Sequence, residues 1–142
     1  MKLSNDINIS KYIIRKSLGI GKNIIGKDIL VKGKQIYLVY INNYIQNEII
    51  YEMVDLLNDL DVNYINCFYL KRLIQNNVYY TYTECFDDIN ELQRGILNGE
   101  LAIIIDGEYE GILVKLNHNK SNSLADGLYS PLSDVSSLRI YN

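Results

Sequence analysis

The stretch LAIIIDGEYEGILVKL, residues 101–116, decides the fold class that this sequence predicts. Its first five residues are all apolar, which is the composition of a strand covered on both faces of a sheet. Asp106 and Gly107 then give a turn signal, and a second apolar run at residues 111–116 returns after it. The stretch therefore predicts a β-hairpin.

The residues before this hairpin extend it into an α/β unit. Residues 78–83 have strand composition, and apolar residues spaced by three and four predict a helix over residues 87–98. Asp87 or Asp88 is expected to cap the start of that helix, and Asn98-Gly99 its end. The resulting order of strand, helix, strand, turn and strand is typical of α/β architecture.

The N-terminal half predicts a second hairpin, also packed by amphipathic helices. Two β-rich runs flank Lys32-Gly33-Lys34 and predict a hairpin over residues 28–41, whose second run is apolar enough for a strand covered on both faces. The expected helices span residues 7–18 (Ser10 as N-cap, Gly19 as stop), 44–60 (Asn42 or Asn43 as cap) and 64–74.

The expected fold class is therefore α/β (α+β), as two small lobes or one compact domain. Each part has a short mixed β-sheet and a hairpin packed by amphipathic helices. The division expected is an N-terminal lobe at residues 1–77 and a C-terminal lobe at residues 78–142, which ends in an irregular polar tail from Asn117.

Composition excludes several classes of function. The 142 residues are 48% hydrophobic and 22% charged, which suits a globular core and excludes wholesale disorder. The net charge is -3, so the chain lacks the excess of basic residues that a general nucleic-acid-binding protein needs. The longest apolar run has five residues, and the N-terminus lacks a signal-peptide core, so we expect a soluble chain without membrane insertion, in a reducing compartment.

Short motifs in both halves resemble those of the A-subunit family of spore germinant receptors, the GerA family. Its members carry a helix ending in Leu-Ser-Gly, a buried strand, the turn Ile-Asp-Gly and a second apolar strand, and further upstream a Leu-Val-Tyr-Ile strand followed by a Gly-Leu-Val-Asp helix start. The corresponding stretches here are Ile96-Leu97-Asn98-Gly99, Ile103-Ile104-Ile105-Asp106-Gly107, Gly111-Ile112-Leu113-Val114 and Leu38-Val39-Tyr40-Ile41. The resemblance covers about residues 14–116, and the helix start after Ile41 departs from it.

The resemblance implies a location and partners. It implies a two-lobed domain at the cytosolic face of the spore inner membrane, other receptor subunits as partners, and no catalytic activity or cofactor. Family members continue into a Pro-rich segment and several membrane helices, which this sequence lacks. The chain is thus the N-terminal domain of such a receptor or a free-standing relative, and the unmatched tail and the Met1 start favour the relative.

Five residues are candidates for contact with a ligand or partner: Asp106, Gly107, Tyr109, Asn98 and Gly99. The alternative, which we favour for the first two, is a hairpin turn in which Gly takes positive φ and Asp bonds the local backbone. Asn98-Gly99 is first a helix C-cap, and Tyr109 is expected to be exposed.

We expect no catalytic, cofactor-binding or metal-binding residues. The acidic pairs, Glu108/Glu110 among them, fit solvated surface, and His118 has no nucleophile partner. Cys67 and Cys85 have no CxxC partner and are expected as reduced, partly buried thiols, with a disulfide between them as the alternative.

The function expected is that of a non-enzymatic sensory or scaffolding domain in spore germination. It would act through contact with another protein or by binding a small-molecule nutrient between lobes. One alternative is a free-standing adaptor, dimeric through an exposed sheet edge next to residues 112–116. The other is a small hydrolase or transferase that uses Asp or Tyr chemistry.

Overall fold

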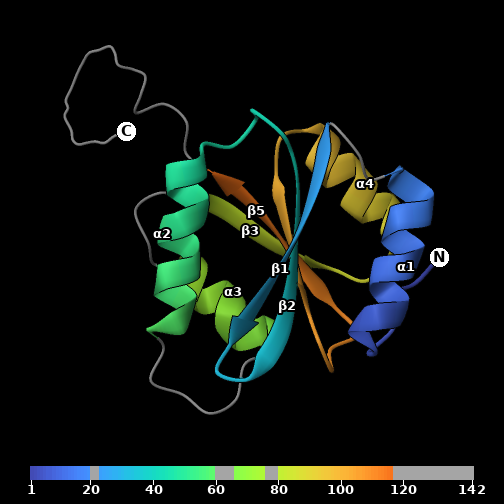
Figure 1. Ribbon diagram of the computed structural model, residues 1–142, viewed down its shortest axis with the longest axis horizontal. Coiled ribbons are helices and arrows are strands. Elements are labelled where there is room, and N and C mark those ends of the chain that lie inside the picture. The colour runs from blue at the N-terminus through green and yellow to red at the C-terminus, as the bar shows by residue number, and fades with distance from the viewer. Residues whose placement is uncertain (20–22, 60–65, 76–79, 117–142) are drawn as a thin grey trace.

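The described part of the chain forms one antiparallel sheet covered by helices on both faces (Figure 1). The computed structural model describes residues 1–19, 23–59, 66–75 and 80–116. In chain order the elements are α1 (Ile7–Leu18), β1 (Ile24–Val31), β2 (Lys34–Ile41), α2 (Asn47–Asn58), α3 (Cys67–Gln75), β3 (Tyr80–Phe86), α4 (Ile89–Leu97), β4 (Leu101–Ile105) and β5 (Gly111–Leu116).

The sheet order is β1-β2-β4-β5-β3, and each neighbouring pair is antiparallel. The α+β class and its single compact domain are therefore confirmed, but the sheet is antiparallel and not mixed. Strands from both halves meet where β2 pairs with β4, with Leu38 opposite Ile103. The expected division at residues 77 and 78 lies outside the described residues.

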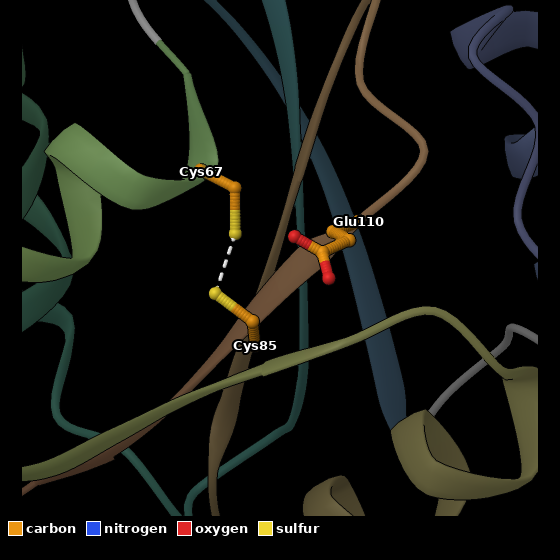
Figure 2. Close-up of side chains that lie close together, drawn as sticks. All are labelled: Cys67, Cys85 and Glu110. Atoms are coloured by element: carbon orange, nitrogen blue, oxygen red, sulfur yellow. Dashed lines mark hydrogen bonds between the residues drawn. The ribbon is translucent and has the colours of Figure 1, made fainter.

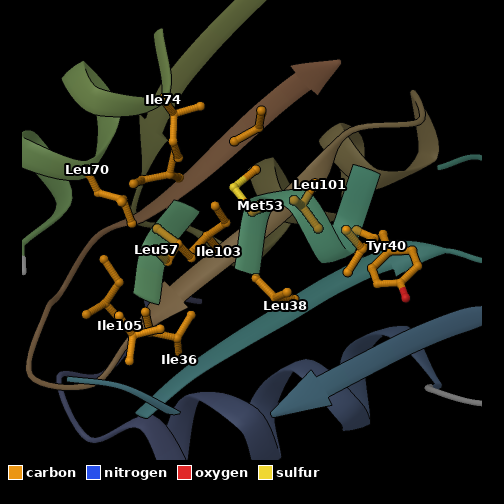
Figure 3. Packing of buried hydrophobic residues seen from close by; sticks show 14 of the residues in the cluster. Ile36, Leu38, Tyr40, Met53, Leu57, Leu70, Ile74, Leu101, Ile103 and Ile105 are labelled. Carbon is orange, nitrogen blue, oxygen red and sulfur yellow. The ribbon is translucent and has the colours of Figure 1, made fainter. Parts of the chain in front are cut away.

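The central strands separate two apolar clusters. Ile36 and Leu38 of β2 point toward α2 and α3, whereas Tyr37 and Val39 point toward α1 and α4. Figure 3 shows the first cluster, in which Met53 of α2 packs over these strands. A strand with helices on both faces must be apolar at successive positions, which is why β2 and β4 read as continuous apolar runs.

The sheet-edge hypothesis for residues 112–116 is wrong. β5 lies between β4 and β3, so both of its edges are hydrogen-bonded. Within the described residues, the terminal strands of the sheet are β1 and β3. A continuous apolar run such as residues 111–114 indicates burial, but it does not tell which strands lie on either side.

The N-terminal hairpin is longer than its sequence pattern indicates. Lys32 and Gly33 alone form the turn, both with positive φ, and Lys34 already pairs with Val31. β1 begins at Ile24, four residues before the predicted start at residue 28. The prediction started the strand too late because Gly26 interrupts the apolar pattern of these residues. A Cβ at Gly26 would overlap the Tyr37 hydroxyl, so the glycine makes room for a ring on the neighbouring strand.

Helix α1 has the expected bounds but a different cap. The Asp6 side chain accepts a hydrogen bond from the Asn8 backbone N–H at 2.9 Å, and Gly19 ends the helix in the left-handed conformation. The prediction of Ser10 as N-cap is wrong: its hydroxyl is buried inside the helix and donates to the Ser4 carbonyl at 2.9 Å.

Helix α2 begins at Asn47, three residues later than expected. Asn43 takes positive φ and Gln46 is extended, so the chain turns before the helix starts. The predicted caps Asn42 and Asn43 are therefore wrong, and Gln46 occupies the N-cap without a side-chain hydrogen bond. Helix α3 starts at Cys67, and the first residues of the helix expected over residues 64–74 lie outside the described residues. The first residues of the strand expected over residues 78–83 also lie outside them.

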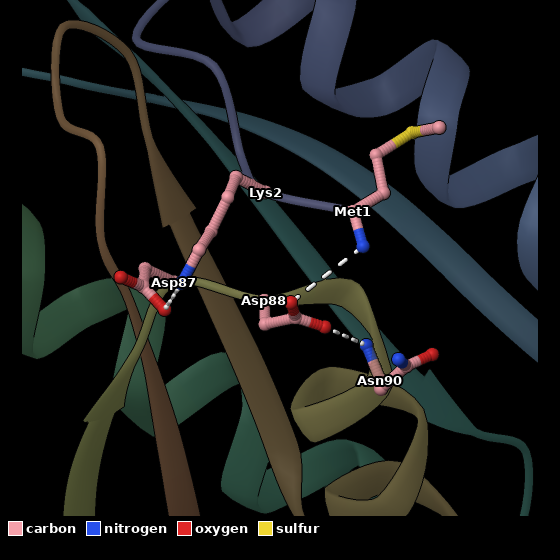
Figure 4. Close-up of polar contacts among 5 residues, drawn as sticks. All are labelled: Met1, Lys2, Asp87, Asp88 and Asn90. Atoms are coloured by element: carbon pink, nitrogen blue, oxygen red, sulfur yellow. Dashed lines mark hydrogen bonds and ion pairs between the residues drawn. The ribbon is translucent and has the colours of Figure 1, made fainter.

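The chain start pairs with the start of α4 (Figure 4). Asp88 caps α4 through the Asn90 backbone N–H at 2.8 Å, which confirms one of the two predicted caps. The Met1 carbonyl accepts from the Ile89 N–H at 2.8 Å, and Lys2 Nζ lies 3.0 Å from an Asp87 carboxylate oxygen. These contacts hold the segment before α1 against the start of α4. None of the described helices is long and apolar enough to cross a membrane.

Candidate functional site

The turn between β4 and β5 holds the chain start in place. The Asp106 carboxylate accepts a hydrogen bond from the Ile7 backbone N–H at 3.1 Å, at the first turn of α1. The Gly107 N–H donates to the Asn5 carbonyl at 2.8 Å, and Gly107 has positive φ. Both residues therefore serve the fold, and their role as contact residues stays a prediction.

The five candidate contact residues do not form one site. Asn98 and Gly99 end α4 and precede β4, whereas Asp106, Gly107 and Tyr109 follow β4. A strand of this length separates the two groups by about 17 Å. Gly99 takes the positive φ of a helix terminus, and Tyr109 is exposed, as expected. Tyr109 is the member of the set with the most freedom to meet a partner.

A groove that the sequence did not predict lies between α1 and the N-terminal hairpin. Its volume is about 330 Å³, and it opens to solvent. Its lining residues are Lys11, Asp28, Ile29, Leu30 and Gln35. Lys11 Nζ and Asp28 Oδ1 are 2.6 Å apart, so the groove's two charges are paired with each other. The sequence could not predict this groove, because the spacing of residues within α1 or within the hairpin does not indicate that the two elements lie side by side.

Strand β1 offers a free edge beside this groove. In a hairpin with a two-residue turn, the residues on either side of the turn form a hydrogen-bonded pair, here Val31 and Lys34. Every second residue of β1, counted back from Val31, therefore forms hydrogen bonds with β2. Gly26, Asp28 and Leu30 then direct their N–H and C=O groups outward. Within the described residues no strand pairs with this edge, and the Leu30 side chain is 62% exposed.

The other terminal strand is less regular. Its pairing with β5 shifts between Tyr80 and Tyr82. Such irregularities twist an edge away from further pairing. β1 pairs in register with β2 over all eight of its residues and is the better template.

A third grouping brings both cysteines together (Figure 2). Cys67 begins α3 and Cys85 lies in β3, and their sulfur atoms are 2.7 Å apart. Both are free thiols, with Cys67 buried and Cys85 half-buried. One carboxylate oxygen of Glu110, just before β5, lies within 4.8 Å of both sulfurs. Sequence reasoning placed Glu110 on solvated surface and did not connect it with the thiols.

The electrostatic setting of this cluster is negative. Burial raises the pKa of the Cys67 thiol, as do its hydrogen bond to Cys85 and the charges of Glu110 and Glu108. Glu108 also accepts a hydrogen bond from the Cys67 backbone N–H at 3.3 Å. The arrangement therefore disfavours a free thiolate.

The comparisons with known proteins identify the family. The model of the family described as "Bacillus/Clostridium GerA spore germination protein" matches residues 11–127. No curated protein matches the chain. The fold is similar to the crystal structure of the N-terminal domain of the A subunit of the Bacillus megaterium spore germinant receptor GerK3. The TM-score is 0.55 at 15% identity, over 80% of this chain and 94% of that one. The chain thus belongs to the GerA family of spore germination proteins.

Proposed function

We propose that this chain is a non-enzymatic domain of a spore germination complex and that it acts through contact with another protein. The partner is a subunit of a germinant receptor or of its membrane complex, met at the cytosolic face of the spore inner membrane. Membership of the GerA family supports the setting, and the fold shared with an A-subunit N-terminal domain supports the role.

The observation that carries the proposal is the open edge of β1. An edge strand with unpaired backbone groups is a template for an added strand from a partner. Main-chain hydrogen bonds supply affinity in such complexes, and pockets for alternate side chains supply specificity. The groove lined by Leu30 and Gln35 lies beside this edge. Every second side chain of a strand added to β1 would point to the face of the sheet on which this groove lies.

Nutrient binding in the same groove is the second candidate. Its volume is at the lower end of the roughly 300–1,000 Å³ common for small-molecule sites. Lys11 and Asp28 are engaged with each other, so a small ligand would have to break that ion pair to use either charge. A protein strand that bonds to the backbone of β1 leaves the pair intact.

The test replaces Leu30 with a photo-crosslinking amino acid in sporulating cells. Leu97 on α4 is the matched control, since it is the same residue type and 60% exposed against 62% for Leu30. We expect position 30 to crosslink to a receptor subunit that mass spectrometry identifies, and position 97 not to. Equal crosslinking at both positions, or none to a receptor subunit, contradicts the proposal.

A second experiment separates a strand partner from a nutrient. Leu30→Asp places a charge on the edge, as natural edge strands do to prevent pairing, and should slow germination where Leu97→Asp does not. In a thermal-shift titration with amino acids, nucleosides and sugars, the chain should show no saturable shift. A saturable shift that Leu30→Asp abolishes would favour the nutrient candidate instead.

A further inference from the structure

Three side chains of metal-binding type converge where α3, β3 and the start of β5 meet. Two are the sulfurs of Cys67 and Cys85, and the third is the Glu110 carboxylate, all within 4.8 Å of one another (Figure 2). They come from a helix, a strand and the turn between β4 and β5, and are far apart in sequence. Their meeting is therefore a property of the tertiary fold and not of a local turn.

The surroundings of these atoms suit a cation. Cys67 is 2% exposed, and its sulfur also lies 3.5 Å from the Gly111 carbonyl oxygen. The Glu108 carboxylate accepts a hydrogen bond from the Cys67 backbone N–H at 3.3 Å, and a Glu110 carboxylate oxygen lies within 4.8 Å of both sulfurs. A divalent cation binds thiolates and is itself attracted by these carboxylates.

We propose that Cys67, Cys85 and Glu110 form a binding site for a thiophilic divalent metal ion of the Zn²⁺ class. Two sulfurs and one carboxylate oxygen are a donor set that zinc accepts, and hard cations such as Mg²⁺ and Ca²⁺ prefer oxygen alone. Binding exchanges two thiol protons for the ion, so about two protons leave per metal bound.

A zinc ion at this cluster needs a small movement of the sulfurs and a fourth donor. Zinc is usually four-coordinate, with sulfur at about 2.3 Å, which places two sulfurs about 3.8 Å apart in a tetrahedral site. The sulfurs, now 2.7 Å apart, therefore separate by about 1 Å when the ion enters. Glu110 is exposed, so solvent reaches its side of the cluster and a water molecule can complete the shell.

The competing interpretation of the thiol pair is a disulfide. Both sulfurs are free thiols 2.7 Å apart, beyond the roughly 2.05 Å of a disulfide bond. A disulfide leaves the position of Glu110 unexplained, whereas a metal site uses it. The geometry with the carboxylate therefore favours the ion.

The test titrates the chelator-treated, reduced chain with Zn²⁺ by calorimetry and with Co²⁺ by absorbance. We expect one ion per chain, about two protons released, and a sulfur-to-cobalt charge-transfer band. Glu110→Gln should weaken Zn²⁺ binding by at least about tenfold, the effect that loss of even an outer-shell partner often has. Cys85→Ser, at the less buried thiol, should weaken Co²⁺ binding and reduce the sulfur-to-cobalt band, because one of the two sulfur donors is lost.

Glu48→Gln is the matched control, since Glu48 is an exposed carboxylate on α2 outside the cluster. It should bind as the parent chain does. Binding that Cys85→Ser leaves unchanged, or a cobalt spectrum without the sulfur band, overturns the proposal. So does a Cys67–Cys85 disulfide in chains alkylated at the moment of lysis. None of these readouts depends on the β1 edge, so the two proposals fail separately.

Discussion

Glu100 is a carboxylate that the fold buries at the start of β4. It is 7% exposed, and its Oε1 has no hydrogen-bond partner within the described residues. Burial raises the pKa of Glu100 above its ordinary value, the charge of Glu84 adds to this effect, and Arg94 and Lys115 partly offset it. The charged form of Glu100 is therefore less favourable in the folded state than in the unfolded chain.

The charge of Glu100 should therefore weaken the fold at neutral pH. A raised folded pKa means that the folded state binds the proton more tightly than the unfolded state, so stability falls as pH rises through that range. Glu100→Gln removes the charge and should raise the free energy of unfolding by about 1 kcal/mol at neutral pH. Chemical denaturation of both chains at neutral and acidic pH is the measurement, and the advantage should shrink in acid. An advantage independent of pH would contradict this explanation.

A substitution at Gly26 is expected to destabilise the fold, in contrast to the one at Glu100. A Cβ there would lie 2.7 Å from Cζ of Tyr37 and overlap its hydroxyl, and Tyr37 is fully buried. Gly26→Ala should therefore destabilise the fold by about 1–3 kcal/mol, the usual effect of overpacking. Tyr37→Phe in the same chain removes the overlapping hydroxyl and should recover part of the loss in denaturation midpoint. Gly33→Ala is no substitute control, because positive φ strains that position. Equal losses with and without the hydroxyl would show that overlap with the hydroxyl is not the cause.

At the scale of elements, sequence pattern located some segments closely. The strands at residues 101–105 and 111–116 and the helix at residues 7–18 have the predicted bounds. In each of these segments the local pattern coincides with what the tertiary structure buries. Buried strands here are uninterrupted apolar runs, and Gly19 ends its helix by its own backbone preference.

Segments whose form depends on distant neighbours were placed less well. The extent of β1 depends on Tyr37 across the strand pair, which sequence spacing does not report. The cysteine and glutamate cluster exists because Cys67 at the start of α3 lies against β3, again a tertiary relation. Asp106 was correctly placed in a turn, but its partner Ile7 is 99 positions away and could not be read from the sequence.

The cap of α4 gives a test at this scale. Asp88 Oδ1 accepts from the Asn90 backbone N–H, and this bond, with the charge of the Met1 amine, lowers the pKa of Asp88. Asp88→Ala should lower the melting temperature by on the order of a few degrees at neutral pH. Asp88→Asn should retain most of the stability, because asparagine caps helices as well.

The pH dependence of that cap has a definite sign. A lowered folded pKa gives stability that is present above the unfolded pKa and lost as pH falls through the folded pKa. The deficit of Asp88→Ala in thermal melts should therefore shrink in acid. A deficit that Asp88→Asn shares in full would assign the effect to the charge pairing with Met1 and not to the cap.

At the scale of the whole molecule, the sheet joins two halves through one strand pair. β2 meets β4 in the middle, and each cluster of the core draws side chains from both sides of that pairing. α2 and α3 of the N-terminal half cover one face, whereas α1 of that half shares the other face with α4 of the C-terminal half, so neither half can bury its apolar residues alone. The open edge of β1 and the thiol–carboxylate cluster are built on this shared frame.

The pairing of Leu38 with Ile103 has a consequence for how the chain is made. During synthesis the N-terminal hairpin leaves the ribosome well before β4 exists. Until then one whole side of β2, an almost wholly apolar strand, lacks its hydrogen-bonded neighbour. Closing a contact of such long range is slow, and a waiting strand edge can recruit a strand from another nascent chain. Efficient production of this domain therefore depends on how quickly residues 101–105 follow.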